Sequence, residues 1–360
     1  MRRFALIHSY IGGTVKSLIL SRRTSKKSVF ALFEEWGPLG NALILVGSLL
    51  ALYKASDWTI TNSVRVADIT GFGKTTVGFL LVAFSTSLPE LCVSIFAVIG
   101  QESIGVAIGN ILGSNIVNVC LILGICFLIL ALKKSNTLTF LPSMAKADIG
   151  SLYFGIFIAS VIPLTLLYIG YASQLIGIVL LMIFVFHVFQ LSKTRNVKEE
   201  GALGGERQRL NRYTLLTFSG AAGVVASSYF IVESAAYLAE EVLHVPPVVI
   251  GATIVALGTS LPELATSIDS IQKGHLDLAL GNIVGSCFIN ITCILGVTLT
   301  ASTLRVVNMS AFSDLVIFSL ITNLLLWYFL SSERISWKEG VILLFMYFVF
   351  LATSFGGYKS

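Results

Sequence analysis

The sequence is poor in charge, since Asp, Glu, Lys and Arg together make up only 12% of its 360 residues. A soluble globular domain typically carries about a quarter charged residues, so this composition excludes an ordinary soluble protein. Hydrophobic residues reach 55% instead. Because apolar runs long enough to cross a hydrocarbon layer of ~30 Å recur along the whole chain, the sequence predicts an all-α polytopic membrane protein that lies in the lipid bilayer.

Residues that often build enzymes and metal centres are also scarce, with five cysteines and four histidines. The cysteines all lie in apolar segments without metal-ligand or disulfide-framework spacing, so we interpret them as packing residues. No predicted span pairs a nucleophile with a base at a suitable spacing, so we expect neither an enzyme nor a cofactor. The net charge of +5 lies in tails and short loops. We therefore expect no nucleic-acid partner, and we expect no obligatory protein partner.

Apolar windows separated by polar breaks predict ten membrane spans. They cover about 37–66, 76–99, 104–131, 147–169, 173–192, 213–242, 247–272, 276–303, 311–331 and 335–356. A basic tail over residues 1–36 precedes the spans, and a polar loop over residues 193–212 separates the first five from the second five. The expected domains are thus two membrane repeats, 37–192 and 213–356, joined by this central loop.

The two groups of five spans share sequence. Gly78–Ser94 matches Gly251–Ser267 at 10 of 17 positions, and Gly109–Gly124 matches Gly281–Gly296 at 9 of 16. Such similarity indicates duplication of a five-helix unit. Because five is odd, the second copy enters the membrane from the opposite side. The sequence therefore predicts two inverted repeats with broken core helices, an architecture typical of secondary transporters.

Basic residues in the loops suggest an orientation. Arg65, Lys133 and the cluster in 193–212 follow odd-numbered spans, whereas the opposite loops hold little beyond Arg305 and Lys359. The positive-inside rule then places the central loop in the cytoplasm and both termini outside. The basic tail 1–36 would favour the reverse, and its sequence is compatible with an interfacial helix, a cleaved leader or an upstream extension. We follow the loops.

Each repeat places the sequence Thr-Ser-Leu-Pro-Glu-Leu inside an apolar span, at 86–91 and 259–264. Proline disturbs a helix by freeing the carbonyl four residues earlier. In lipid, such a break persists where it lines a cavity or binds a ligand. Carbonyl, hydroxyl and carboxylate oxygens together form the kind of site that a hard cation prefers. One such fragment comprises Ala83, Thr86, Ser87, Glu90 and Ser94, and the other Ala256, Thr259, Ser260, Glu263 and Ser267.

A second motif supplies more oxygen ligands. On helices, the stripes Asn110, Ser114, Asn118 and Asn282, Ser286, Asn290 each lie on one face. A single intramembrane glutamate can serve a structural hydrogen bond, but two at equivalent places favour function. Two carboxylates balance one Ca²⁺ or are shared among several Na⁺. If both ions need the same carboxylates they compete, and competition at a site open to one side at a time is antiport.

These motifs resemble those of the cation/calcium antiporter superfamily, and most closely its sodium/calcium exchanger branch, whose alpha-repeats read GTSLPE followed by GN-x-x-GSN. Here they are STSLPEL with GNILGSN, and GTSLPEL with GNIVGSC. The resemblance covers roughly residues 37–356, and the GNATEL-like motif of the proton-coupled branch is absent from the sequence. It implies secondary active exchange of Ca²⁺ for Na⁺ by alternating access, with electrogenic calcium extrusion across the plasma membrane.

The same resemblance implies roles for individual residues. Glu90 and Glu263 are the implied central ligands of both ions, and Thr86 and Thr259 offer backbone carbonyls to calcium. The other implied ligands are Ala83, Ser87, Ser114, Ala256, Ser260 and Ser286 at the sodium sites, with Asn118 and Asn290 completing the cluster.

The chain departs from the family pattern in two ways. Many relatives carry an aspartate at one of the positions that match Asn118 and Asn290, so the ion stoichiometry is left open and potassium co-transport is disfavoured. Ser85 and Cys287 replace a glycine and an asparagine that the opposite repeat keeps as Gly258 and Asn115.

Two alternatives stay open. The first is the same fold coupled to H⁺ or K⁺, or carrying another divalent cation such as Mg²⁺ or Mn²⁺. The second belongs to a different class, a cation channel with a fixed pore. Saturable turnover that needs a counter-ion separates the antiporter from the channel.

Overall fold

A computed structural model describes most of the chain. The described residues are 35–59, 61–62, 65, 86–99, 104–133, 138–139, 146–194, 210–272, 276–302, 304, 306–332 and 334–356. Residues 1–34 of the expected tail, most of the central loop 193–212 and the first part of the second predicted span therefore lie outside them. One predicted ligand, Ala83, also lies outside the described residues.

The described residues form almost only helices, as expected where lipid offers the backbone no hydrogen bonds. After a first helix over Glu35–Thr59, the elements are α3 Leu88–Ile99, α4 Ile104–Ile116, the π-helix η1 Val117–Ile122, α5 Leu123–Lys133, β1 Leu138–Thr139, α6 Lys146–Ile169, β2 Tyr171–Ser173, α7 Gln174–Thr194, α8 Leu210–Tyr237 and the π-helix η4 Leu238–Val242. The remainder are α9 Pro247–Ile250, the π-helix η5 Gly251–Val255, α10 Ala256–Thr259, α11 Leu261–Gln272, α12 Leu276–Ile289, the π-helix η6 Asn290–Ile294, α13 Leu295–Ala301, β3 Val306–Asn308, the 3₁₀-helix η7 Met309–Phe312, α14 Ser313–Ser331, β4 Arg334–Ile335 and α15 Trp337–Gly356.

Seven continuous helical segments of the described chain are long and apolar enough to cross a membrane. They are Glu35–Thr59, Ile104–Leu132, Leu152–Ile169, Leu210–Tyr237, Leu278–Ala301, Met309–Ser331 and Trp337–Gly356. A bent pair, Pro247–Thr259 with Leu261–Gln272, makes an eighth if it counts as one span. The apolar helices Leu88–Val98 and Gln174–Gln190 are shorter. The polytopic helical class is thus confirmed, while the count of ten spans stays a prediction.

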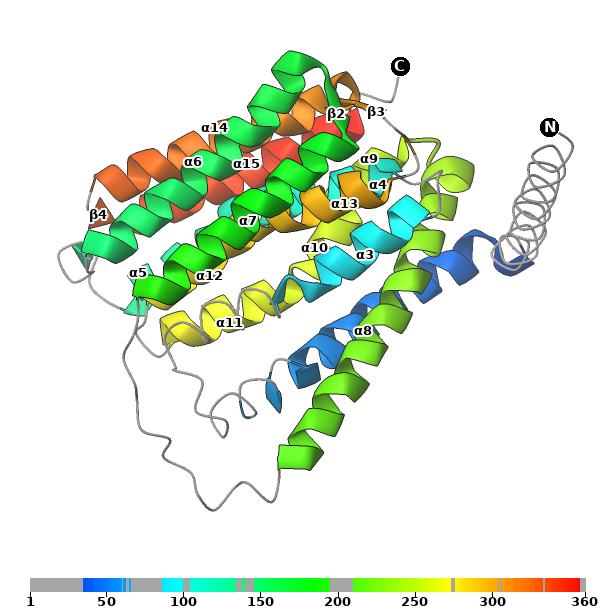
Figure 1. Ribbon diagram of the computed structural model, residues 1–360, viewed down its shortest axis with the longest axis horizontal. Helices are drawn as coiled ribbons and strands as arrows, with labels where there is room; N and C mark the ends of the chain where they lie inside the picture. Colours follow the sequence, from blue (N-terminus) through cyan, green and yellow to red (C-terminus); the bar gives the residue numbers. More distant parts are fainter. Residues whose placement is uncertain are drawn as a thin grey trace, which may run out of the picture.

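The helices divide into two groups that meet around α3, α4 and α10 to α12. Figure 1 shows α6, α7, α14 and α15 gathered at one side, and α8 with the blue first helix at the other. Each group has its own apolar cluster: one is centred on α4, α5, α12 and α13, and the other joins the first helix, α3 and α8. This division leaves the helices that carry the two glutamates between the groups.

Glycines allow the central helices to pack backbone against backbone. A Cβ added to Gly109 on α4 would lie 2.5 Å from the carbonyl oxygen of Val248, so only glycine fits there. Gly124 and Gly340 make a similar contact between α5 and α15, and Gly177 and Gly296 make one between α7 and α13. Small residues at such crossings are the usual means by which membrane helices approach closely.

Two pairs of short antiparallel strands tie the loops together. β1 pairs with β4, with Leu138 opposite Ile335, and β2 pairs with β3, with Ala172 opposite Val307. Each pair joins one loop from the first half of the chain to one loop from the second half. The two halves are therefore linked at the loops as well as through their packed helices.

Candidate cation site

Glu90 and Glu263 each lie at the third position of a helix. α3 begins at Leu88, following a turn residue at Ser87, and α11 begins at Leu261, following Ser260. The axes of the helices on either side of Ser260 differ by 44°. Both carboxylates therefore lie in the first turn of a helix, where the macrodipole favours negative charge.

The prolines lie next to these helix starts. We expected Pro89 and Pro262 to break the span that contains them, and the 44° bend at Ser260 agrees with this for the second motif. In the structure each is the second residue of a new helix, where a missing N–H costs little because first-turn N–H groups have no partner within the helix. The break in the second motif lies between α10 and α11, at Ser260, two residues before Pro262.

The structure brings the predicted ligands together in the protein interior. Both glutamates are fully buried, as are Thr86, Thr259, Ala256, Ser114, Ser286, Asn118 and Asn290, and Ser87 and Ser260 are 1% exposed. Every predicted ligand except Ala83, which is not described, is therefore withdrawn from solvent. Burying two carboxylates is costly unless other groups or a ligand compensate for their charge.

The carboxylates are held by hydroxyl groups from the opposite motif. Ser260 donates a hydrogen bond to Oε1 of Glu90 at 3.1 Å. In the reverse sense, Ser87 donates to Oε1 of Glu263 at 3.4 Å. Ser286 also donates to Oε1 of Glu263 at 3.4 Å, and its hydroxyl lies 3.3 Å from that of Ser87. Each carboxylate is thus tied to a motif more than 150 residues away in the chain.

The second oxygen of each carboxylate has no protein partner. Oε2 of Glu90 and Oε2 of Glu263 are buried and make no hydrogen bond within the described chain. No basic side chain of the described residues contacts either carboxylate. A buried anionic oxygen without a donor is strongly unfavourable, which points to a cation or a proton as its partner during function.

Asn110 and Asn282 attach the glutamate helices to the neighbouring spans. The amide of Asn110 donates to the backbone oxygen of Glu90 and to Ser94, both at 3.4 Å. That of Asn282 donates to Thr266 at 3.0 Å and to Ser267 at 3.2 Å. These contacts join α3 to α4 and α11 to α12, so we assign both asparagines to positioning the site.

The remaining two asparagines lie in π-helical turns. Asn118 is in η1 and Asn290 is the first residue of η6. A π-turn inserts one extra residue into a helix, re-aims the side chains beside it and often marks a functional site. The amide of Asn290 donates to Oδ1 of Asn115 at 3.0 Å. Among the described residues, neither amide atom of Asn118 has a nitrogen or oxygen partner, and the side chain lies within hydrogen-bonding reach of the thiol of Cys287.

Sequence reasoning overlooked two contacts. Asn115 was noted only as a departure from symmetry with Cys287, yet it is the hydrogen-bond acceptor that orients Asn290. The hydroxyl of Thr259 donates to Oδ1 of Asn110 at 3.0 Å and lies 3.5 Å from Ser114, so its side chain as well as its backbone belongs to the cluster. The motif difference between Asn115 and Cys287 was the available signal for the first contact.

The donor set of the cluster suits a hard cation. No group of three or more His, Cys, Asp or Glu side chains suited to a metal occurs among the residues that the structure describes. The cluster instead joins two carboxylates to hydroxyl and amide oxygens, which are ligands typical of calcium and sodium.

Comparison with known proteins identifies the family. The sodium/calcium exchanger protein family matches residues 40–192 and 212–356. Sodium/calcium exchanger MaX1 of Methanosarcina acetivorans is 31% identical over 88% of this chain and 98% of its own length. Inner membrane protein YrbG of Escherichia coli is 30% identical over 72% of this chain and 78% of its own length.

Comparison with solved structures agrees with this family match. The sodium-calcium exchanger NCX_Mj, at 26% identity, covers 88% of this chain and 98% of its own with a TM-score of 0.61. The H⁺/Ca²⁺ exchanger CAX shares the fold, with a TM-score of 0.69 over 86% of this chain and 81% of its own at 19% identity. The sequence-based prediction of a membrane transporter rather than an enzyme is confirmed, and the chain belongs to the sodium/calcium exchanger protein family.

Proposed function

We propose that the protein exchanges Ca²⁺ for Na⁺ across a membrane by alternating access, with Glu90 and Glu263 as the central ligands of both ions. The observation that carries this proposal is the pair of buried carboxylates, each held at Oε1 by a serine of the other motif and each unpartnered at Oε2. The Oε2 atoms are the ligand positions, and the serines keep both carboxylates directed into one cluster.

Charge balance supports competition between the two ions. The paired carboxylates carry a formal charge of −2, which one Ca²⁺ neutralises and which several Na⁺ can share. We propose the remaining ligands as the sequence implies them: Thr86, Thr259, Ser87, Ser260, Ala83, Ala256, Ser114, Ser286, Asn118 and Asn290. Because one cluster cannot hold both sets of ions at once, binding of one drives release of the other.

The proposed architecture is two inverted five-span repeats, at 37–192 and 213–356. The reciprocal strand pairing supports it. β1 follows the third predicted span and pairs with β4, which follows the ninth, while β2 follows the fourth and pairs with β3, which follows the eighth. Paired loops must lie on one side of the membrane, and an odd number of spans per repeat satisfies this condition for both pairs.

Two helices stand out as candidates for movement. The first helix and α8 lie together beside the core, and a Cβ on Gly220 would lie 2.9 Å from the carbonyl oxygen of Ala55. We propose that this pair slides against α3, α4, α11 and α12 to open the site to either side in turn. The central loop faces the cytoplasm and the membrane is the plasma membrane in this proposal.

Radiolabelled calcium uptake tests the coupling ion. Proteoliposomes that hold the full chain are loaded with Na⁺, K⁺ or acidic buffer, beside the double variant Glu90→Gln, Glu263→Gln. We expect uptake only with an outward Na⁺ gradient, and none in the variant. Uptake that follows the proton gradient would replace Na⁺ by H⁺, and unsaturable flux without any counter-ion would indicate a channel.

Membrane voltage tests the charge that moves. If one Ca²⁺ exchanges for three Na⁺, one net positive charge crosses per cycle, which is worth about 2.3 kcal/mol per 100 mV. Setting the vesicle potential with a potassium gradient and valinomycin should then change the initial uptake rate. A rate that stays constant over 100 mV would exclude this stoichiometry.

A further inference from the structure

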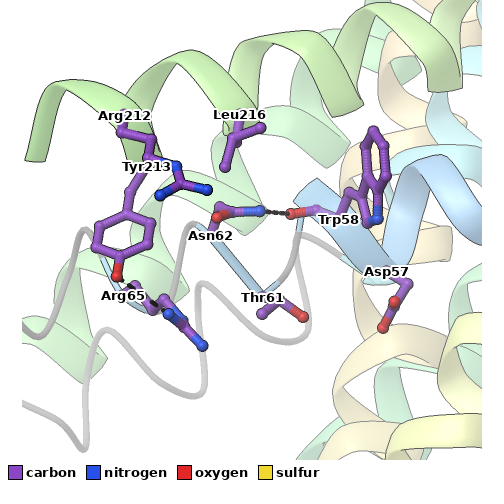
Figure 2. Close-up of a pocket in the computed structure, with 8 residues that line it drawn as sticks. All are labelled: Asp57, Trp58, Thr61, Asn62, Arg65, Arg212, Tyr213 and Leu216. Carbon is purple, nitrogen blue, oxygen red and sulfur yellow. Dashed lines mark hydrogen bonds between the residues drawn. The ribbon is translucent and has the colours of Figure 1, made fainter. Parts of the chain in front are cut away.

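A second polar region lies away from the cation site, where the first helix and α8 separate. A pocket of about 380 Å³ is lined by Asp57, Trp58, Thr61, Asn62, Arg65, Arg212, Tyr213 and Leu216. Figure 2 shows that these residues come from two segments, the end of the first helix with the residues just after it, and the first turns of α8. The two segments are more than 140 residues apart in the chain.

The two helices contact each other closely just before the pocket opens. Gly220 of α8 packs so tightly that a Cβ there would lie 2.9 Å from the backbone nitrogen of Thr59. From this crossing the chain continues to Arg65 on one side and back to Arg212 on the other. The pocket therefore occupies the wedge between two diverging helices, at one end of both.

Two arginines lie on one side of this pocket. Arg65 donates a hydrogen bond to the hydroxyl of Tyr213 at 3.1 Å, and its guanidinium carbon lies 5.2 Å from the centre of that ring. Arg212 extends from the same turn of α8, and both guanidinium groups lie on the Tyr213 side of the pocket (Figure 2). Among the described residues, no carboxylate forms an ion pair with either arginine.

The remaining lining places the pocket at the level of lipid headgroups. Asp57 lines the far end, beyond Trp58, away from the two guanidinium groups (Figure 2). Trp58 is 57% exposed, and the outward side chains of α8 beside the pocket, Leu215 and Phe218, are 70% and 71% exposed. Tryptophan, tyrosine and arginine above a lipid-facing apolar surface are typical of the boundary between hydrocarbon and headgroups.

We propose that this pocket binds the phosphodiester group of a membrane phospholipid, with Arg65 and Arg212 as the phosphate ligands and Tyr213 as the residue that positions Arg65. A guanidinium presents several N–H donors in a plane that matches phosphate oxygens. Basic pockets between membrane helices at the cytoplasmic side commonly bind lipid headgroups. Leu216 and the exposed apolar side chains of α8 would then line the path of the acyl chains.

The bound phospholipid would join the first helix to α8. If these two helices slide during alternating access, on which this step rests, the lipid would move with them. Binding of the lipid is independent of ion coupling, however, so it is measured directly rather than through transport.

Native mass spectrometry of the detergent-purified full chain tests the proposal. Phosphatidylglycerol, phosphatidylethanolamine and a neutral diacylglycerol are titrated into the wild type and into the double variant Arg65→Gln, Arg212→Gln. The matched control is Lys54→Gln, Lys338→Gln, which removes the same charge at exposed positions outside the pocket. We expect both phospholipids to bind the wild type and the control, with at least about tenfold weaker binding to the arginine variant.

Each remaining outcome is decisive. Equal binding by the arginine variant and the lysine control would overturn the proposal, as would equal binding of diacylglycerol, which lacks the phosphate. A thermal-unfolding series with inorganic phosphate separates the two sources of phosphate, since protection equal to that by phospholipid would assign the pocket to a soluble anion instead. Because Tyr213→Phe keeps the ring and loses the hydroxyl, we expect it to weaken binding less than loss of either arginine.

Discussion

The surroundings of Glu90 and Glu263 differ although the two residues occupy equivalent places in one duplicated motif. Oε1 of Glu90 accepts one serine hydrogen bond, from Ser260 at 3.1 Å, whereas Oε1 of Glu263 accepts two, from Ser87 and Ser286, both at 3.4 Å. Ser114 corresponds to Ser286 in the other repeat, but its hydroxyl lies 3.5 Å from Thr259. A duplicated sequence thus preserves the exchange of partners between repeats without making the two carboxylates identical.

The asparagines of the same repeats differ more. Asn290 is oriented by Asn115, while the position equivalent to Asn115 in the other repeat holds Cys287. A thiol is a poor hydrogen-bond acceptor, and both amide atoms of Asn118 remain unpartnered and buried. One substitution between the repeats therefore leaves one amide fixed by the protein and the other available to a ligand.

The largest expected effect comes from neutralising the carboxylates one at a time. Glu90→Gln and Glu263→Gln keep the shape of the side chain and one oxygen, but each removes half of the charge that attracts the ion. We expect either change to lower calcium uptake roughly 100-fold or more, since breaking a buried charge pair costs ~3–5 kcal/mol.

The measurement is initial-rate calcium uptake at saturating outward Na⁺, with the amount of folded protein checked by size-exclusion chromatography. Asp314→Asn, a change at an exposed carboxylate at the start of α14, is the control. A single variant that keeps half of the wild-type rate would remove that glutamate from the set of ligands.

Adding a third carboxylate, at Asn118 or at Asn290, should have a smaller effect than neutralising a glutamate. We expect this effect to differ between the two repeats. Asn118→Asp places a charge where no protein donor is available, so we expect lower thermal stability without calcium and about tenfold tighter calcium binding. Asn290→Asp should lower the thermal stability without calcium by a smaller amount, because Asn115 can turn its unpartnered amide nitrogen toward the new carboxylate.

Thermal unfolding of both variants across a calcium titration compares the two positions. The contrast between the repeats would be contradicted if Asn290→Asp lost as much stability without calcium as Asn118→Asp. Calcium stabilisation of Asn118→Asp equal to that of the wild type would place Asn118 outside the ion site.

The serine hydroxyls should show the asymmetry of the carboxylates directly. Ser260→Ala removes the serine donor of Glu90, and a hydrogen bond to a charged group contributes ~1.5–3 kcal/mol, so we expect about a tenfold loss of apparent calcium affinity. Ser87→Ala leaves Ser286 on Glu263, and its longer bond predicts a loss of about threefold. The concentration dependence of calcium uptake measures the apparent affinity of both variants. A larger loss of affinity in Ser87→Ala than in Ser260→Ala would show that Glu263 depends more on its partners than Glu90.

The smallest expected effect comes from a substitution that makes position 287 the same in both repeats. Cys287→Asn gives Asn118 the same kind of partner that Asn290 has in Asn115, so we expect a gain of about 1 kcal/mol in the free energy of unfolding. The midpoint of thermal unfolding measures it, and Cys287→Ser serves as the control that changes the thiol without supplying an amide. If both variants shift the midpoint equally, the amide of Asn118 does not bond to position 287.

The sequence predicted the class of fold because lipid imposes a strong composition rule on every span. It also predicted the oxygen-bearing residues that the structure buries together, since Thr-Ser-Leu-Pro-Glu-Leu occurs twice in spans where a carboxylate is costly. The break that we expected at the second motif is present, since the helix axes on either side of Ser260, two residues before Pro262, differ by 44°. The sequence did not reveal that Pro89 and Pro262 each occupy the second position of the helix that follows, because proline is compatible with both a kinked helix and a first turn.

The amino-acid sequence by itself determined which residues are present at the site and that there are two copies of them. Only the tertiary structure decided which hydroxyl serves which carboxylate, because Ser260 reaches Glu90 and Ser87 reaches Glu263 across separations of 170 and 176 residues. It also decided that Arg65 and Arg212, 147 positions apart in the chain, line one pocket. Spacing along one helix predicts which side chains share a face, but contacts between helices depend on how glycine crossings set their distance and angle.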